Sequence, residues 1–428
     1  MSPQIYSIDD VFGICRNLPL NYVSRESADD AFINSLARKK HVVIYGSSKQ
    51  GKTSLRKKCL LEDDCIVISC TSSLTIGDLN IQILKHAGYK ITNTTIGASG
   101  RTKLFAQLRT VFPLGDARAS SEIEREHSEY TQHKELELDR DDVNDIIYAL
   151  KKINFSRYIV LEDFHYLKPD IQQAFAEELK IFFDNSDISF IIIGVWLEAD
   201  RLGTYNGDLA GRFISINADR WLGNELLRAI TIGEELLNIR FFEGFKTTLI
   251  DHCFQSVSLV QEACHKCCML EKILTTQNMR RENVGMTIDA TKVLEDIVNE
   301  TSGGRYNSHL ENFAEGFQTT ELEMFKWLLN PIFNATINDL EAGVTRKKIS
   351  DTLNKIHPKR PINQGNITQA LQVLNGLQQQ KNIKPIIFDY DISARKLRVV
   401  DKGFLIWLSM QDISNLLTEY EINVDIND

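Results

Sequence analysis

Residues 41–53 read HVVIYGSSKQGKT, and this stretch decides the fold class of the chain. Residues 42–45 are β-branched or aromatic, which is typical of a buried parallel strand. The eight residues that follow fit the pattern G-x-x-x-x-G-K-[ST] of a phosphate-binding loop. Glycines let such a loop curl until its backbone N–H groups converge on phosphate oxygens, and the helix expected at residues 54–61 points its positive end at the same anion. The sequence therefore predicts a nucleotide site here.

The residues of this loop have expected roles. Lys52 should reach the β- and γ-phosphates of ATP, and Thr53 should place its hydroxyl on Mg²⁺. A nucleotide other than ATP remains an alternative, although the chain has no Asn-Lys-x-Asp motif of the kind that recognises guanine. The expected nucleotide contacts are Gly46, Ser47, Ser48, Lys49, Gln50, Gly51, Lys52, Thr53 and Ser54.

Apolar runs and amphipathic stretches alternate after the loop, as in a doubly wound parallel sheet. Strands are expected at residues 65–70, 157–163, 189–195 and 212–217, and helices at residues 77–86 and 143–153. The second of these strands, RYIVLED, ends in Glu162 and Asp163. It resembles the Walker B strand of P-loop ATPases, which usually ends Asp-Glu.

In the Walker B pattern the first acid supports the Mg²⁺ shell and the second polarises the attacking water. The resemblance therefore implies that Glu162 binds the metal and that Asp163 acts on the water. Because aspartate is the shorter side chain, this reversed order would give slow hydrolysis. The alternative is a pair of acids at a strand end beside a turn.

Residues 22 to about 270 resemble the P-loop ATPases of the AAA+ and STAND groups, particularly the origin-recognition-like branch. The resemblance rests on Tyr22-Val23-Ser24-Arg25-Glu26, on the loop at residues 46–53, on Glu162 and Asp163, and on Arg212. It implies that Arg25 packs near the nucleotide base. It also implies that Arg212, just before the last strand, supplies an arginine finger to a neighbouring copy in a homo-oligomer. A surface arginine at a strand start is the alternative for Arg212.

Two positions depart from the family pattern. The fourth strand ends in Gly194-Val195-Trp196, where a polar sensor residue is common. The lid helix expected at residues 258–269 carries Gln261 and no well-placed arginine. Both departures favour a nucleotide switch over a fast motor.

The composition of the chain further limits the class of protein to which it can belong. The chain has 428 residues, which indicates two or three domains, and 43% hydrophobic residues, an ordinary globular value. It has no run of about 18 apolar residues and no signal-like start, so a soluble cytoplasmic protein without a membrane partner is expected. Eight unevenly spaced cysteines do not suggest a disulfide framework. Cys264, Cys267 and Cys268 suit a zinc site or a packed core, and core packing is favoured.

Charge is unevenly distributed along the chain. The net charge is −9, yet residues 341–402 hold twelve Lys or Arg against five Asp or Glu and so carry +7. Helices are expected at residues 322–329, 344–356 and 366–377, and a β-hairpin at residues 386–400. This order resembles a winged helix-turn-helix.

A winged helix of this kind predicts a DNA partner, read by glutamines in the major groove and held by basic residues on phosphates. Docking of an unidentified protein partner is the alternative. The candidate DNA contacts are Arg346, Lys347, Lys348, Gln369, Gln372, Arg395, Lys396 and Arg398.

The predicted fold is α/β: a three-layer P-loop NTPase core with a parallel sheet, a helical lid and a C-terminal winged-helix domain. The predicted function is an ATP-driven switch that oligomerises and acts on or near DNA, in prokaryotic defence or DNA transactions. A STAND-like signalling scaffold and an ATP-gated transcription regulator are the alternatives. The expected segments are a linker at 1–30, the ATPase core at 31–220 with an acidic insertion at about 115–145, the lid at 221–300, a linker at 301–317, and the winged helix at 318–428.

Overall fold

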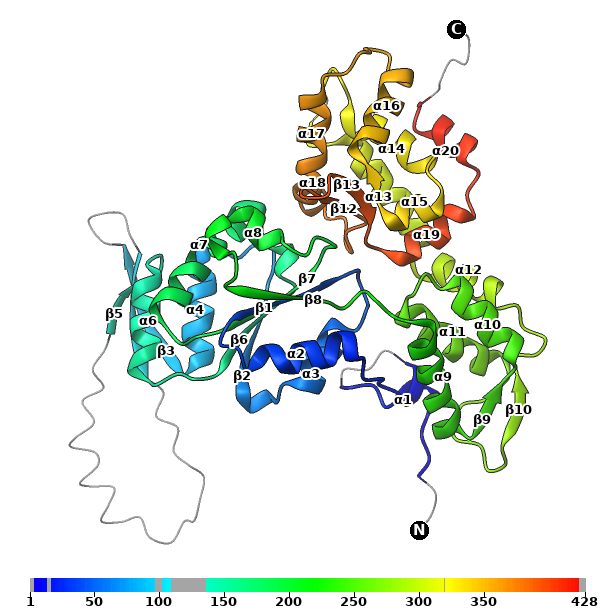
Figure 1. The fold of residues 1–428 in the computed structure, drawn as a ribbon, viewed down its shortest axis with the longest axis horizontal. Coiled ribbons are helices and arrows are strands. Elements are labelled where there is room, and N and C mark those ends of the chain that lie inside the picture. Colours follow the sequence, from blue (N-terminus) through cyan, green and yellow to red (C-terminus); the bar gives the residue numbers. More distant parts are fainter. Residues whose placement is uncertain (1–3, 14–16, 97–101, 109–135, 319, 423–428) are drawn as a thin grey trace.

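The computed structural model describes residues 4–13, 17–96, 102–108, 136–318 and 320–422 (Figure 1). Its centre is a five-stranded parallel sheet in the order β2-β6-β7-β1-β8. The strands are β1 (His41–Gly46), β2 (Cys65–Ser69), β6 (Tyr158–Glu162), β7 (Phe190–Val195) and β8 (Phe213–Asn217). All five lie where the sequence predicts a strand.

Helices cover both faces of this sheet, because alternate residues of the central strand β1 enter two different cores. Val42 and Ile44 pack into one core with Leu55, whereas Val43 and Tyr45 pack into the other. The helices that cover the sheet are α2 (Ala31–Leu36), α3 (Lys52–Cys59), α4 (Ile76–Ala87), α6 (Val143–Lys152) and α7 (Pro169–Asn185). This is the predicted α/β fold of a P-loop NTPase.

A second sheet, which the sequence did not predict, flanks this core. Its antiparallel strands are β3 (Tyr89–Ile96), β4 (Thr102–Leu108) and β5 (Leu136–Asp139). The acidic insertion expected at about 115–145 lies outside the described residues up to residue 135. Residues 136–145 of the expected insertion form β5, which pairs with β4, and the start of α6.

The helical lid is built from α9 (Gly223–Leu237), α10 (Glu243–His252), α11 (Val257–Leu270) and α12 (Ala290–Val298), with a two-stranded sheet of β9 (Ile239–Phe241) and β10 (Arg281–Val284). Cys264, Cys267 and Cys268 are fully buried in its hydrophobic core, which confirms the predicted packing role. Among the described residues no group of three or more His, Cys, Asp or Glu side chains is placed to hold a metal ion.

The N-terminal segment, expected from the sequence to be a linker, packs against the lid. Helix α1 (Ile8–Phe12) contacts α9 and α11, and Phe12 is 1% exposed. Gly233 makes room for this ring, because a Cβ at that position would lie 2.2 Å from Phe12 Cζ.

The linker expected at 301–317 is largely helical. Helix α12 continues through Asn299–Gly303 into α13 (Gly304–Glu315). Burial of Tyr306 and Phe313 outweighs the low helix propensity of the two adjacent glycines.

The C-terminal domain contains a small antiparallel sheet in the order β11-β13-β12. Its strands are β11 (Val344–Thr345), β12 (Phe388–Asp391) and β13 (Lys396–Val399). Its helices are α14 (Met324–Phe333), α15 (Ile337–Ala342), α16 (Arg346–Ile356), α17 (Gln364–Gln372), α18 (Leu374–Gln380), α19 (Lys402–Ser409) and α20 (Ile413–Glu419). The third predicted helix is thus two helices, which meet at Val373.

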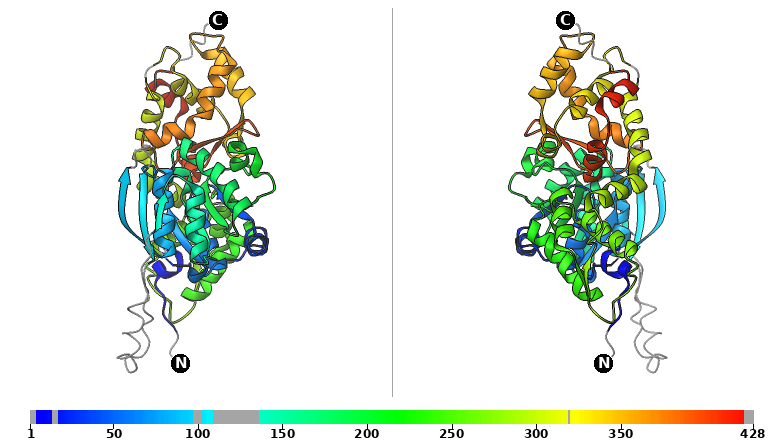
Figure 2. Two further views of the ribbon diagram at one scale, coloured as in Figure 1. Left: turned by 90° about the vertical axis from the view of Figure 1, so that its left-hand side faces the viewer. Right: turned by 90° about the vertical axis from the view of Figure 1, so that its right-hand side faces the viewer.

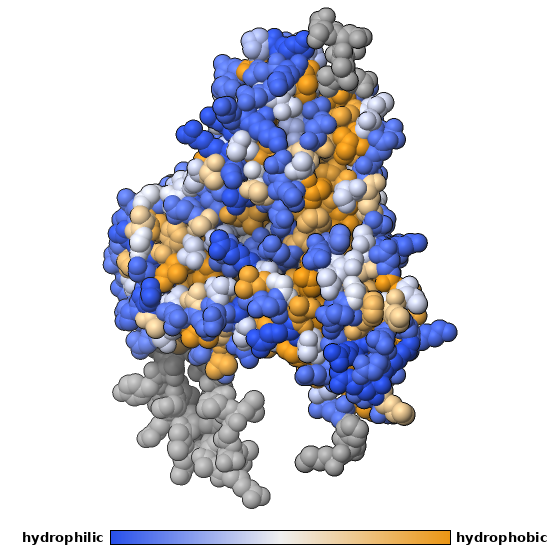
Figure 3. All heavy atoms as spheres, turned by 45° about the vertical axis from the view of Figure 1, so that its right-hand side comes forward, coloured by the Kyte–Doolittle hydropathy of each residue, from blue (hydrophilic) through white to orange (hydrophobic). Residues whose placement is uncertain are grey.

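The lid and the C-terminal domain share one continuous hydrophobic core, which runs from Ile8 to Ile422. The C-terminal domain meets the ATPase core through a much smaller cluster of Val195, Ile386 and Val400. Figure 2 shows the C-terminal domain stacked at one end of the molecule, and in Figure 3 hydrophobic residues form a band from this domain toward the lower part. Within the described ranges, no helix is both long and apolar enough to cross a bilayer.

Candidate nucleotide-binding site

The phosphate-binding loop lies where several parallel strands end at the same edge of the sheet. The loop follows β1, Asp163 follows β6, Trp196 follows β7 and Asp219 lies just beyond β8. The loop needs glycine at its start, because Gly46 has φ +150° and a Cβ there would lie 2.9 Å from the backbone nitrogen of Asp219. Ser47 N–H donates to the Asp219 carboxylate at 2.9 Å. The loop geometry therefore depends on Asp219, a residue that sequence analysis did not identify.

A cavity of about 390 Å³ opens beside this loop. Its wall includes loop residues 48–54, the acids Glu162 and Asp163, and lid residues such as Gln261. The N-terminal segment closes another side through Phe12 and Tyr22. The cavity therefore lies between the ATPase core and the lid, and it brings together the loop and both predicted acids.

Lys52 is buried at the centre of the loop. Its Nζ donates to Gly46 O at 3.1 Å and to Ser47 O at 2.5 Å. Burial lowers the pKa of Lys52 to about 8, although Asp219 and Asp163 act in the opposite direction. An anion placed in the cavity would raise this pKa again, because an opposite charge favours the protonated amine.

The two predicted acids have different surroundings. Glu162 Oε2 accepts from Thr53 Oγ1 at 3.2 Å, while its Oε1 forms an ion pair with Arg56 at 3.1 Å. Asp163 has a left-handed backbone with φ +58°. Burial raises the pKa of Asp163, the neighbouring Glu162 raises it further, and Lys52 lowers it. Thr53 and Glu162 are thus adjacent, as the predicted metal role requires.

Several buried polar atoms of the site have no partner among the described residues. They are Ser47 Oγ, both amide atoms of Gln50, His165 Nδ1 and Trp196 Nε1. His165 lines the cavity, and burial lowers its pKa to about 3. Sequence analysis did not select His165, although its position two residues after Asp163 was a usable signal.

Arg25 does not itself line the cavity. Its packing near a nucleotide base stays a prediction. Its Nη1 donates to Ala218 O at 2.9 Å, and its guanidinium lies 4.1 Å from the ring centroid of Trp221. Trp221 lines the cavity and donates from Nε1 to Gln50 O at 3.3 Å. Arg25 therefore supports the site through Trp221.

Arg212 lies at the opposite edge of the sheet, since its carbonyl accepts from the N–H of His41 at the start of β1. Its guanidinium forms an ion pair with Asp184 at 3.2 Å and also donates to Asp208 O. It cannot reach the cavity of its own chain. A role toward a neighbouring copy stays a prediction.

Gln261, on the lid, forms a reciprocal amide pair with Asn21, both bonds being 2.8 Å. Both residues line the cavity. This pair ties the lid to the N-terminal segment at the predicted nucleotide site.

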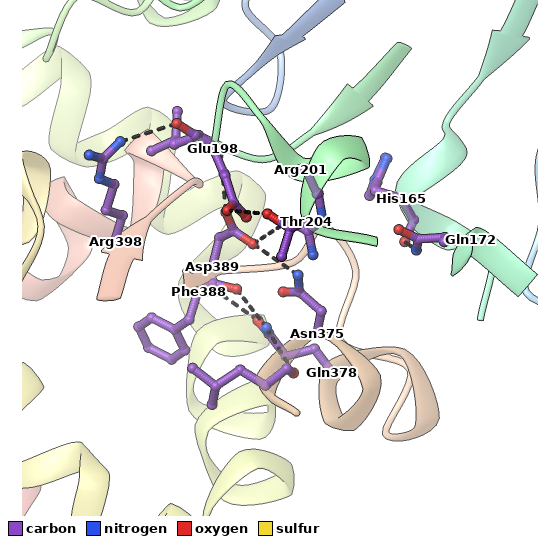
Figure 4. A network of polar contacts seen from close by, with 12 residues as sticks. His165, Gln172, Glu198, Arg201, Thr204, Asn375, Gln378, Phe388, Asp389 and Arg398 are labelled. Carbon is purple, nitrogen blue, oxygen red and sulfur yellow. Dashed lines mark hydrogen bonds and ion pairs between the residues drawn. The ribbon is translucent and has the colours of Figure 1, made fainter. Parts of the chain in front are cut away.

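The C-terminal domain reaches the phosphate-binding loop directly. The backbone N–H of Ser48 donates to Val400 O at 3.0 Å. Beside this bond, Asp389 of β12 forms an ion pair with Arg201 of the ATPase core at 2.8 Å (Figure 4). Gln379 donates from its side chain to His165 O and Leu167 O, immediately after the acid pair. The loop, the acid pair and the C-terminal domain are thus linked by polar contacts.

The candidate DNA contacts do not form one free surface. Arg398 donates to Leu197 O of the ATPase core at 3.2 Å (Figure 4), and Gln372 lines a small pocket shared with that core. Gln369 lines a separate groove rich in glutamate. Three other candidates have partners within the C-terminal domain: Arg346 donates to Thr368 at 2.8 Å, Lys348 pairs with Asp339 at 2.8 Å, and Lys396 donates to Ala342 O at 3.5 Å. Lys347 and Arg395 are exposed.

This fold is shared with known P-loop ATPases. Over 94% of its length the chain matches all of a Walker-type ATPase of Pyrococcus abyssi, with a TM-score of 0.57 and 12% identity. At that identity the likeness establishes the fold alone, which is the predicted P-loop ATPase fold.

Two origin-recognition structures align more loosely. The Aeropyrum pernix ORC2 protein, in ADPNP–ADP complexes, matches 95% of this chain and 99% of its own, with a TM-score of 0.43 and 12% identity. The Aeropyrum pernix ORC1 protein in complex with DNA matches 97% and 100%, with a TM-score of 0.43 and 11% identity. No protein-family model and no curated protein sequence matches the chain.

Proposed function

We propose that the chain is an ATP-binding, slowly hydrolysing switch of the AAA+/STAND type that oligomerises and acts on or near DNA. The observation that carries this proposal is the cavity in which the glycine-rich loop, Lys52 and the Thr53–Glu162 pair meet. A loop of this geometry at the end of a parallel strand is suited to binding phosphate, because backbone N–H groups and a lysine converge there.

The residues present fit both ATP and Mg²⁺. The unpartnered amide nitrogen of Gln50, which lines the cavity, is a donor that a bound phosphate could satisfy. Thr53 and Glu162 supply the oxygen atoms that Mg²⁺ prefers. Bound Mg²⁺ would neutralise charge on the β- and γ-phosphates. Asp163, with its raised pKa, is the base that orients water, and Lys52 holds the phosphates.

Nucleotide binding is tested by titrating labelled ATP into wild type, Lys52→Ala and Lys58→Ala. Lys58 is an exposed lysine of the same helix and lies outside the cavity, so it is a matched control. Lys52→Ala should lose binding and Lys58→Ala should keep it. Hydrolysis then separates the acids: Asp163→Asn should bind Mg·ATP and fail to hydrolyse it, whereas Glu162→Gln should require more Mg²⁺. Equal binding by Lys52→Ala and wild type would overturn the proposal.

The DNA part of the proposal rests on the C-terminal domain. Its strand order β11-β13-β12, with α16 and α17 between the first two strands along the chain, supports a winged helix-turn-helix, and residues 341–402 carry +7. Because Arg398 and Gln372 face the ATPase core, DNA contact through them requires this domain to move. Lys347 and Arg395 are exposed already.

Duplex DNA binding should be measured with and without Mg·ATP over a range of salt, while light scattering reports particle size. Binding that needs ATP, falls steeply with salt and fails in Lys52→Ala supports the switch. A homo-oligomer assembled through the Arg212 side should be lost in Arg212→Ala. If DNA is ignored in every state at low salt, the alternative is a STAND-like signalling scaffold whose winged helix docks a protein. One preferred sequence would instead indicate an ATP-gated transcription regulator.

A further inference from the structure

The C-terminal domain carries a large groove that is distinct from the nucleotide cavity. It has a volume of about 1130 Å³ and shares none of its lining residues with that cavity. Its walls come from α13, α14, α17 and the end of α20. Because it exceeds the usual 300–1,000 Å³ of a small-molecule pocket, it suits a segment of polypeptide better than a metabolite.

The floor of this groove is apolar and partly open. Phe317 is 41% exposed and Val373 is 36% exposed. Phe317 packs edge-on against Phe325, with ring centroids 5.7 Å apart, and the half-buried Leu322 adds to the same surface. An exposed apolar surface of this kind in a folded domain commonly marks an interaction site.

The rim of the groove is acidic. Among the described residues that line it, the cations are Lys326, which pairs with Glu421 at 3.1 Å, and Lys381, which pairs with Glu315 at 2.7 Å. Against these stand six exposed glutamates, which leave the rim with a formal charge of −4. The glutamates are Glu311, Glu315, Glu321, Glu323, Glu419 and Glu421.

The acidic rim also acts on a side chain inside the groove. Tyr420 lines it, and burial raises the pKa of this phenol, with Glu419 and Glu311 raising it further. Neither of these two glutamates forms an ion pair among the described residues. Their charge is therefore available to a partner.

We infer that this groove docks an amphipathic helix from a partner protein, with apolar residues on one face and Lys or Arg along its edges. An apolar floor receives the apolar face, as in other helix-in-groove complexes. An acidic rim attracts basic edges and repels nucleic acid phosphates. Gln369, expected from sequence to read DNA, lines this groove beside Val373 and so contacts the helix instead.

The probe is a fluorescein-labelled model helix with leucine on one face and lysine on the other, titrated into the full-length protein by anisotropy. Saturable binding is expected. A scrambled peptide of the same composition, which lacks an apolar face, and a leucine–glutamate helix should both bind at least about tenfold more weakly. The site does not depend on ATP, so Lys52→Ala should bind the lysine helix as wild type does.

Two changes in the groove test its location. Glu311→Lys combined with Glu419→Lys should weaken binding about tenfold, and Phe317→Ser about as much. Glu177→Lys makes one such charge reversal, half of the double variant's charge change, on an exposed position of α7 and should have no effect. Thermal melts and circular dichroism establish that each variant is folded.

The inference is overturned if the scrambled peptide binds as well as the helix, or if both groove variants bind like Glu177→Lys. It is also overturned if the groove variants weaken duplex DNA binding while leaving the helix bound, since the groove would then be a nucleic-acid surface.

Discussion

Replacing Asp389 with alanine should destabilise the protein far more than the loss of a surface ion pair. The Asp389 side chain is 1% exposed, and its carboxylate accepts from Arg201 at 2.8 Å and from Asn375 at 2.9 Å. The backbone N–H of Leu197 adds a third bond at 3.2 Å. Alanine would leave the Arg201 guanidinium, which is 11% exposed, without its counter-charge. Breaking a buried ion pair in this way costs about 3–5 kcal/mol.

Urea unfolding followed by tryptophan fluorescence measures this loss. Trp196 reports on the junction, because the Arg201 guanidinium lies 5.5 Å from its ring centroid. The control is Lys39→Ala, which removes an ion pair with Asp187 in which the side chains are 82% and 93% exposed. That pair should contribute less than about 1 kcal/mol.

A double variant makes the test sharper. Asp389→Leu with Arg201→Met removes both charges, so it should recover much of the stability lost in Asp389→Ala. If Asp389→Ala costs no more than Lys39→Ala, or if the double variant is no more stable than the single one, the reasoning about this junction is refuted.

Three further predictions concern other parts of the chain. Burial raises the pKa of Glu178 from 4.5 to about 7, so between these pH values the folded protein holds a proton that the unfolded chain releases. The free energy of unfolding should therefore fall by about 3 kcal/mol as the pH rises from 4.5 to 7. Urea unfolding measured across this pH range should show the fall in wild type and not in Glu178→Gln. Gly233→Ala should lower the free energy of unfolding by about 1–3 kcal/mol, because the new methyl group overlaps Phe12; a gain in stability, as expected from helix propensity alone, would contradict this. Arg56→Gln frees Glu162 from its ion pair. The Mg²⁺ concentration needed for half-maximal ATP hydrolysis should therefore change, whereas ATP binding without metal should not. An unchanged Mg²⁺ dependence would count against a metal role for Glu162.

Sequence analysis predicted elements correctly where the pattern of side chains that indicates them lies within one short segment of the chain. The strand, glycine-rich loop and helix at residues 41–59 are contiguous, and each element has its own pattern of side chains. The acids at the end of β6 were found for the same reason. Glu162 does lie 3.2 Å from Thr53, and this proximity follows from the parallel order of the strands.

Predictions that depended on a distant partner were less successful. Sequence analysis selected Arg25, but it could not predict that Arg25 contacts the ring of Trp221 and the carbonyl of Ala218. The sheet of β3, β4 and β5 joins segments on either side of residues 109–135, and no local periodicity predicts that pairing. Asp219 belongs to the site only because β8 lies beside β1.

Expected breaks in the chain also failed where packing outweighed local preference. Residues 301–317 were expected to form a linker, yet the chain there is largely helical, and one face of the helix beyond Gly303 and Gly304 is buried. The long apolar repeat at residues 367–377 predicted one helix, but one helix ends and a second begins at Val373. Gln369 lines the acidic groove, and Gln372 on the same helix α17 lines a pocket at the ATPase core.

The bond from Ser48 to Val400 has a thermodynamic consequence. A backbone N–H has one hydrogen, so under the proposed function a phosphate oxygen and the Val400 carbonyl compete for the same donor. A bond worth about 1 kcal/mol corresponds to roughly a fivefold change in an equilibrium constant. By linkage, the docked C-terminal domain would weaken ATP binding by that factor, and bound ATP would weaken docking equally. The affinity for ATP and the docking equilibrium of the C-terminal domain would then both report the same coupling free energy.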